Sequence, residues 1–182
     1  MKVGRTLYVK NRTEWRKWLR AHNQSTTEIW LIYYKKVSGK PRIPYNDAVD
    51  EALCFGWIDG ILKPIDERKY AQRYSPRKKT SKLSDMNRER VRRLIKAGRM
   101  TKAGMAAIAH TGKGPTKLPA DILERLKEDP TVWRNFQQFP ASYKRIRLGW
   151  INAARVRREA FEQRLRYFLK MTAQNKRFGM VQ

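Results

Sequence analysis

Residues 57–75 read WIDGILKPIDERKYAQRYS. Two runs rich in β-branched and aromatic residues, 57–63 and 69–75, flank Pro64-Ile65-Asp66-Glu67. Proline followed by acidic residues is typical of a tight turn between strands. This part of the chain therefore predicts a β-hairpin.

The segments before the hairpin predict further strands of the same β-sheet and two helices. Residues 28–36 (EIWLIYYKK) and, more briefly, 6–9 predict further strands. Between them, Asn11 followed by Glu14 resembles a capping box and predicts the start of a helix. A second helix, ending near Cys54, leads into the hairpin. The pattern predicts an α+β fold with a small antiparallel sheet packed on helices.

From Ser84 onward the sequence predicts helices almost throughout. Gly98 is placed to end the first of them, and prolines stand at the predicted first positions of three later helices, Pro119, Pro130 and Pro140. The stretch 111–115 (TGKGP) is typical of a linker. We therefore expect an α+β domain at 1–112 and a helical domain at 113–182.

Charge is the most unusual property of the composition. The chain has 42 Lys and Arg against 16 Asp and Glu, a formal net charge of +26, and a pI near 10.7. Such an excess destabilises a compact chain by self-repulsion, which favours a negatively charged partner. Nucleic acid is the commonest such partner, and an anionic membrane surface is the second. A generally basic surface with no polyanion role is the alternative.

The cysteine content and the hydropathy of the sequence bear on where in the cell the protein is found. Cys54 is the one cysteine, which rules out a disulfide framework and a metal site built from several cysteines. The opening residues, MKVGR, contain no apolar signal-peptide region, and no apolar run approaches 18 residues. We expect a cytoplasmic protein.

Several segments resemble one known family. The core pattern of the YdeI/OmpD-associated (bacteriocin-protection) family is similar to residues 48–60 (AVDEALCFGWIDG), 70–78 (YAQRYSPRK) and 81–87 (SKLSDMN). Residues 119–123 (PADIL) and 150–154 (WINAA) resemble that family's helical tail domain. The resemblance implies the YjbR/CyaY-like fold group, in which DNA binding is suspected, and a link to bacteriocin protection and envelope stress. It implies no established chemistry.

A basic run crosses the end of the hairpin and the next helix, and it is the first candidate site. Arg88, Arg92 and Lys96 are spaced i, i+4, i+8 and predict one ridge of a helix that Ser84 begins. An array of long cations beside a helix N-terminus suits a phosphate backbone. A solvated helix face is the alternative. The candidate nucleic-acid or anion-binding residues are Arg73, Arg77, Lys78, Lys79, Lys82, Ser84, Arg88, Arg92, Lys96 and Arg99.

A second candidate lies on the hairpin itself. In one register, Trp57, Asp59, Arg73 and Ser75 would line one hollow suited to a small molecule or nucleotide, with Asp59 and Arg73 paired across the strands. The alternative is a structural salt bridge with Trp57 in the core.

The C-terminal helix offers a third possibility. Phe161, Leu165, Phe168 and Leu169 form an apolar stripe among arginines, which predicts core packing or, alternatively, docking on anionic lipid.

Signals for catalysis are poor. His22 and His110 have no serine or cysteine at a recognisable nucleophile spacing, and no phosphate-binding loop, dinucleotide motif or zinc-protease motif is present. We expect a binding protein that uses no cofactor and no metal, rather than an enzyme.

Overall fold

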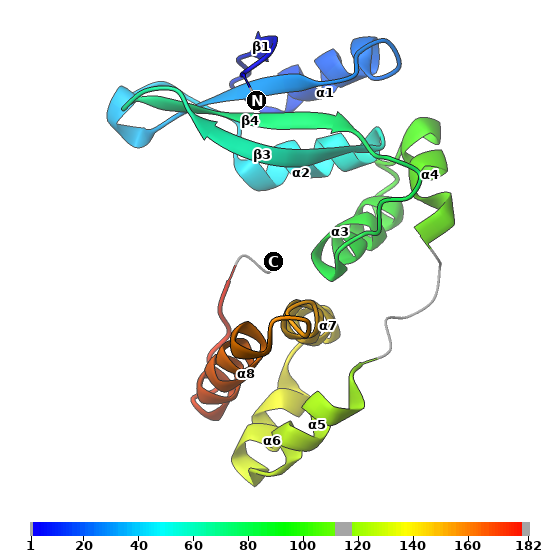
Figure 1. The fold of residues 1–182 in the computed structure, drawn as a ribbon. Helices are drawn as coiled ribbons and strands as arrows, with labels where there is room; N and C mark the ends of the chain where they lie inside the picture. The colour runs from blue at the N-terminus through cyan, green and yellow to red at the C-terminus, as the bar shows by residue number, and fades with distance from the viewer. Residues whose placement is uncertain (1, 112–117, 180–182) are drawn as a thin grey trace. The chain divides into compact units, whose positions relative to one another are not determined.

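The computed structural model describes residues 2–111 and 118–179, which fall into two compact units (Figure 1). Unit 1 comprises Met1–Lys82 with Arg90–Gly112, and unit 2 comprises Leu83–Glu89 with Lys113–Gln182. The predicted linker at 111–115 lies almost wholly outside the described residues, with Thr111 alone inside them. Across the described ranges, no helix combines the length and the apolar character needed to cross a membrane.

The sheet of unit 1 confirms the predicted hairpin and the α+β class. Its order is β1-β2-β4-β3, formed by β1 (Thr6–Leu7), β2 (Ile29–Tyr34), β3 (Trp57–Pro64) and β4 (Lys69–Pro76). β4 pairs antiparallel with both β2 and β3. β1 runs parallel to β2, so the sheet is mixed rather than wholly antiparallel. A helix connects these two strands, and a helical crossover is what a parallel pair requires.

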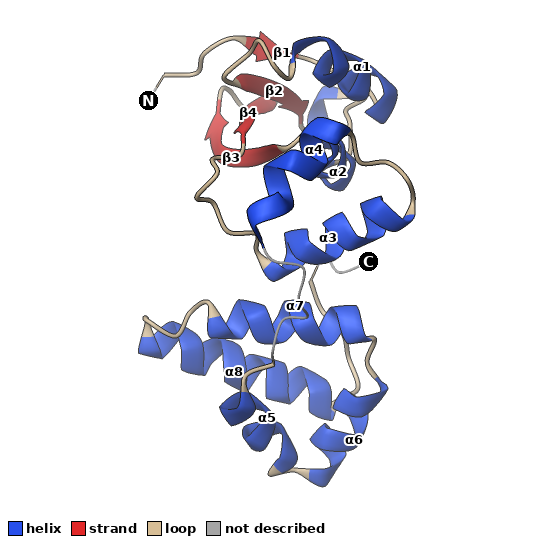
Figure 2. Ribbon diagram, turned by 90° about the vertical axis from the view of Figure 1, so that its right-hand side faces the viewer, coloured by secondary structure: helices blue, strands red, loops and turns tan. Residues whose placement is uncertain are grey.

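Two helices, α1 (Arg12–His22) and α2 (Tyr45–Cys54), cover one face of this sheet (Figure 2). The cap half of the predicted capping box is present: the Asn11 side chain accepts from the Glu14 N–H at 3.0 Å. The return bond differs, because Glu14 accepts from the N–H of Lys10, one residue before the cap, at 2.8 Å. Trp15 is fully buried, and its indole donates to the Ala48 carbonyl at 3.0 Å. Indole burial therefore fixes α1 on α2.

Helices α3 (Asp85–Lys96) and α4 (Lys102–Ile108) follow the sheet, and the division between units crosses α3 after Glu89. Gly98 has φ +63° and follows the end of α3, as predicted. A Cβ at Gly104 would lie 2.1 Å from the Cys54 carbonyl oxygen, so the α4 backbone needs glycine to approach the end of α2. The Thr101 hydroxyl donates to that same carbonyl at 2.7 Å. Short one-turn helices, η1 (Lys36–Ser38) and η2 (Ala109–Thr111), complete unit 1.

Four helices make up most of unit 2: α5 (Ala120–Lys127), α6 (Pro130–Gln138), α7 (Ala141–Asn152) and α8 (Arg158–Ala173). Pro130 occupies the first turn of α6 behind an Asp129 cap, as predicted. Pro119 and Pro140 are themselves the N-cap residues of α5 and α7, one position earlier than predicted. Proline fits both places because neither needs a backbone N–H.

The apolar stripe of α8 is used inside unit 2. Leu165 and Phe168 belong to the buried core, and Phe161 and Leu169 are partly buried against it. Core packing, the first of the two interpretations, is therefore confirmed. Little of this stripe remains for the lipid-docking alternative, because Leu165 and Phe168 are buried and Phe161 and Leu169 are partly so. The buried core cluster consists of Ile122, Leu126, Val132, Phe136, Phe139, Tyr143, Leu148, Ile151, Leu165 and Phe168.

Candidate anion-binding site

The site begins with two buried carboxylates on α2. Asp50 and Glu51 are 2% and 0% exposed, because residues 48–54 are buried on every side of this helix. Isolated buried carboxylates are strongly unfavourable, so each one requires cationic partners nearby. Their neighbours in the chain, Ala48, Val49, Ala52 and Leu53, are apolar and supply none.

Glu51 is met by three arginines from two segments. Arg12 and Arg16 reach it from successive turns of α1, with Nη1 of Arg16 at 2.6 Å from Oε2. Arg12 and Arg99 both pair with Oε1. Arg16 also donates to the Arg99 carbonyl at 3.0 Å. One carboxylate thus holds three guanidinium groups together.

Asp50 collects a second set of arginines. Arg90 and Arg93 of α3 donate to its two oxygens at 2.9 and 2.7 Å. Arg12 lies 3.7 Å from the same Oδ2 that Arg93 contacts, so Arg12 links the two carboxylate clusters. Arg90 is itself buried and also donates to the Asn46 side chain at 2.5 Å. The result is a continuous arc of arginines that joins α1, α2 and α3.

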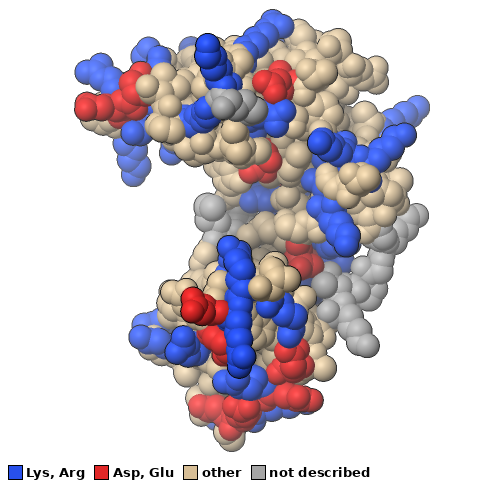
Figure 3. Space-filling view, in the orientation of Figure 1, with Lys and Arg blue, Asp and Glu red and all other residues tan. Residues whose placement is uncertain are grey.

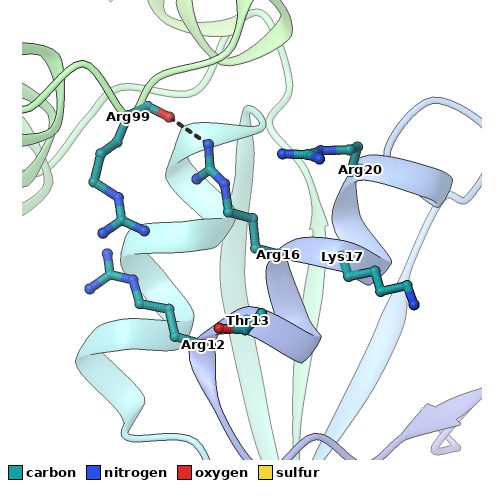
Figure 4. Close-up of a pocket in the computed structure, with 6 residues that line it drawn as sticks. All are labelled: Arg12, Thr13, Arg16, Lys17, Arg20 and Arg99. Atoms are coloured by element: carbon teal, nitrogen blue, oxygen red, sulfur yellow. Dashed lines mark hydrogen bonds between the residues drawn. The ribbon is translucent and has the colours of Figure 1, made fainter.

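A hollow of about 570 Å³ opens beside this arc (Figure 4). The heads of Arg12, Arg16 and Arg99 converge there, and Arg20 extends toward them, whereas Lys17 points outward. Arg20 and Lys17 are exposed, and neither has a carboxylate partner within the described ranges. The hollow is lined by Arg12, Thr13, Arg16, Lys17, Arg20 and Arg99.

Electrostatics keep this hollow cationic. Burial lowers the pKa of Arg12 and of Arg16, but the hydrogen bond and charge of Glu51 outweigh it and hold each pKa above the ordinary value. Burial raises the pKa of the neighbouring Cys54 thiol, with the Glu51 charge acting in the same direction. A protonated, buried thiol is a poor nucleophile. The arrangement is suited to holding an anion rather than to attacking a substrate.

The members of the predicted basic run have different surroundings. Arg99 enters the hollow, but Arg73 pairs with Glu28 at 2.8 Å and Arg77 donates to the carbonyls of Ser81 and Lys82. Ser84 caps α3, as predicted, by accepting from the Asn87 N–H at 3.3 Å. Arg88, Arg92 and Lys96 all lie on α3 at the predicted i, i+4, i+8 spacing, and Arg88 and Arg92 have interaction partners. Lys78, Lys79, Lys82 and Lys96 are exposed.

Sequence reasoning missed α1 as a source of cations, although the signal was present. Arg12, Arg16 and Arg20 have the same i, i+4, i+8 spacing that marked Arg88, Arg92 and Lys96. A second signal was the adjacent acid pair Asp50-Glu51 inside an apolar helix. Such a pair predicts that basic residues from elsewhere in the chain must reach it.

The predicted hairpin hollow is corrected by the strand register. Trp57 lies opposite Pro76 and Asp59 opposite Tyr74, so Trp57 and Asp59 share a face with even-numbered residues of β4. Arg73 and Ser75 therefore point to the other face. Asp59 instead accepts from the Tyr45 hydroxyl at 2.6 Å. Trp57 is buried and donates to the Asn23 carbonyl.

Both histidines lie beside backbone carbonyls. His22 stacks on Trp18 and its Nδ1 lies 2.9 Å from the Trp18 carbonyl oxygen. His110 Nε2 lies 3.3 Å from the Ser81 carbonyl oxygen. In the part of the chain that the structure describes, no three His, Cys, Asp or Glu side chains gather as metal ligands would.

Two family models match the chain in different halves. Residues 7–107 match a domain of unknown function (DUF8412), and residues 115–175 match the family described as "Bacteriocin-protection, YdeI or OmpD-Associated". No curated protein and no solved structure matches the chain. The segments 48–60 and 70–78, which carried the resemblance in the N-terminal half, lie inside the DUF8412 match and outside the YdeI/OmpD-associated match. Neither family description names the YjbR/CyaY-like fold group. The chain therefore belongs to the DUF8412 family and carries a YdeI/OmpD-associated bacteriocin-protection domain at residues 115–175.

Proposed function

We propose that this chain binds nucleic acid, or another phosphate-bearing polyanion, without catalysing a reaction, and that the arginine-lined hollow beside α1 is the binding site. The observation that supports this proposal is the convergence of Arg12, Arg16 and Arg99 on one side of a 570 Å³ hollow that Arg20 also faces. We further propose a cytoplasmic location, where nucleic acids are accessible.

Glu51 acts as a positioning residue in this proposal. Each guanidinium carries five N–H donors, and Glu51 engages only part of those on Arg12, Arg16 and Arg99. Arg12 also contacts Asp47 and Asp50, and Arg16 donates to the Arg99 carbonyl. The donors that these contacts leave over are the ones proposed to meet phosphate oxygens. Because the carboxylate already fixes the heads, a ligand incurs less of the entropy cost of ordering long side chains.

The helix supplies spacing as well as charge. Arg12, Arg16 and Arg20 repeat every fourth residue, which sets them about 6 Å apart along the α1 axis. A row of guanidinium groups can follow a phosphate backbone without reading bases. Cation excess supports this: five Lys and Arg line the hollow, against the carboxylates of Glu51, Asp50 and Asp47, and Asp50 is shared with Arg90 and Arg93.

The test uses fluorescence anisotropy with duplex DNA, single-stranded DNA and RNA over a range of salt concentrations. The variant is Arg20→Gln, because Arg20 extends toward the hollow and supports neither buried carboxylate. We expect weaker binding to every sequence and a salt slope reduced by about 1, since each lost phosphate contact removes about 0.9 from the slope.

The control is Lys79→Gln, which makes the same charge change in the exposed part of the predicted basic run. We expect its affinity to stay within about twofold of wild type, apart from the small general effect of net charge. Equal weakening by both variants would assign binding to overall charge and refute the hollow. An absence of binding to all three nucleic acids at low salt would refute the function.

A further inference from the structure

One end of the unit 1 sheet brings together the exit of β2 and the β3–β4 turn. Tyr34 pairs with Lys69, and the Lys35 N–H donates to the Arg68 carbonyl at 2.8 Å. The turn closes on itself because the N–H groups of Ile65 and Asp66 both donate to the Lys69 carbonyl. The loop containing η1 and the hairpin turn therefore form one surface, which we call the sheet tip (residues 35–42 and 63–69).

Exposed aliphatic side chains lie at this tip and on the edge strand beside it. Val37 and Ile65, at the tip, are 76% and 41% exposed. Ile61 and Leu62, on the edge strand β3, are 48% and 54% exposed, and Leu62 is level with Gln72 and Leu31, inward of the tip. Single exposed aliphatic residues are ordinary, but two at one end of the sheet with two more on the adjoining edge indicate an apolar contact with a partner.

The tip is held in this shape by its own hydrogen bonds. Asp66 Oδ1 accepts from the N–H groups of Arg68 and Lys69 at 2.8 and 2.9 Å. In the neighbouring loop, the Ser38 hydroxyl donates to the Lys35 carbonyl at 2.7 Å, and Gly39 takes φ +67° to complete the turn. These bonds fix both turns, so Val37 and Ile65 are presented to solvent rather than folded back on the sheet.

Cations surround the aliphatic group. Seven basic residues belong to the tip, against the two carboxylates of Asp66 and Glu67, and Figure 3 shows both kinds of charge at this end of the molecule. Asp66 is already used within the turn, where backbone hydrogen bonds lower its pKa. The basic residues are Lys35, Lys36, Lys40, Arg42, Lys63, Arg68 and Lys69.

We propose that the sheet tip docks on an anionic lipid surface. Aliphatic residues on a fixed projection gain by entering the boundary between headgroups and acyl chains, and lysines around them meet the headgroup phosphates. A nucleic acid explains this surface less well, because base stacking needs exposed aromatic rings. Beside the tip, the half-buried Tyr34 ring is already engaged, because Lys40 lies over it and Tyr8 packs against it edge to face. This site is separate from the arginine-lined hollow, and its residues do not overlap with those of α1.

The experiment is flotation of the full chain with vesicles of phosphatidylcholine alone and of phosphatidylcholine mixed with phosphatidylglycerol. The variant is Val37→Ser with Ile65→Ser, which removes apolar area and leaves the charge unchanged. The matched control is Ile95→Ser with Val156→Ser, two aliphatic residues that are also exposed but lie elsewhere.

We expect wild type to float with the mixed vesicles and not with phosphatidylcholine alone. The tip variant should partition about tenfold more weakly, as expected for losing the burial of two aliphatic side chains, and the control should match wild type. Lys36→Gln with Arg68→Gln should also weaken flotation, because the surface potential acts on each cation.

Three outcomes would overturn the proposal: no flotation with either vesicle, equal flotation of the tip variant and wild type, or equal loss in the tip variant and its control. Anisotropy with DNA on the same proteins keeps the two proposals apart. The tip variant should bind DNA as wild type does, so lipid docking and nucleic-acid binding can fail independently.

Discussion

The two units stabilise their interiors by different means. Unit 1 places two carboxylates, Asp50 and Glu51, in its interior and surrounds them with arginines. Unit 2 builds a core of ten apolar side chains, and its buried Asn135 is satisfied by the backbone carbonyls of Thr172 and Ala173. Both units carry many arginines, so composition does not distinguish them. What distinguishes them is whether the carboxylates are buried.

The contrast shows how an ion pair's location decides its consequence. Asp121 and Arg155 in unit 2 form a well-aligned pair at 3.0 Å, but about half of each side chain is exposed. Exposed pairs contribute little because water and salt screen them. Glu51 has no exposed surface, so its removal leaves the charges of the surrounding arginines without the buried carboxylate that compensates them.

The largest expected effect comes from Glu51→Ala. It should lower the free energy of unfolding by about 4 kcal/mol, because three guanidinium groups lose a shared, buried partner. Urea unfolding followed by circular dichroism measures the change. The control is Asp121→Ala, which should unfold at close to the wild-type urea concentration. If the two variants behaved alike, burial would not be what separates the units.

Leu126→Ala tests the apolar core of unit 2. Leu126 is fully buried among the core side chains, and its truncation should cost about 3 kcal/mol through lost burial and a residual cavity. The same urea experiment measures it, and Ile95→Ala, at an exposed position, is the control. A loss well below 1 kcal/mol would mean that the unit 2 core collapses readily around the gap.

Removing a helix-capping side chain should destabilise unit 1 and unit 2 by similar amounts. Asn11→Ala removes the cap of α1, and Asp129→Ala removes the cap of α6, where Asp129 accepts from the N–H groups of Thr131 and Val132. Each change should cost about 1 kcal/mol. Thermal unfolding of the two variants gives the comparison. A cap that mattered in only one unit would show that tertiary context outweighs this local effect.

The smallest expected effect is a pH dependence at Glu28. The hydrogen bond from Arg73, assisted by Trp30, holds the pKa of Glu28 below its ordinary value of 4.5. A pKa lowered by folding adds stability above the unfolded-state pKa, and that stability is lost as pH falls through the folded-state pKa. Glu28→Gln should therefore lose less stability than wild type as pH drops below about 4.5.

Melting temperatures between neutral pH and pH 3 measure this difference. Asp121→Asn should show the same trend in unit 2, because the Arg155 hydrogen bond lowers the pKa of Asp121. The trend should be modest in both cases, since both pairs are partly exposed. If Glu28→Gln lost stability in acid as steeply as wild type, Glu28 would not contribute to the pH dependence of stability.

Much of the local structure follows from the sequence. The hairpin, the Asn11 and Ser84 caps, the Gly98 helix end and the Asp129 cap all depend on residues within a few positions of one another. The sheet was expected to be wholly antiparallel, but the direction of β1 depends on where α1 returns the chain. The prediction of a hollow on the hairpin was wrong for a related reason, because a shift of one residue in strand register moves a side chain to the opposite face of the sheet.

The α+β class, the helical C-terminal part and the excess of positive charge could be read from composition and short-range periodicity alone. Where that charge gathers depends on how the chain packs. Arg12 and Arg99 reach Glu51 from 39 and 48 residues away, and no local pattern in the chain encodes such a meeting. The physical reason is that a buried carboxylate must find its cations wherever packing brings them, and packing is a property of the whole unit.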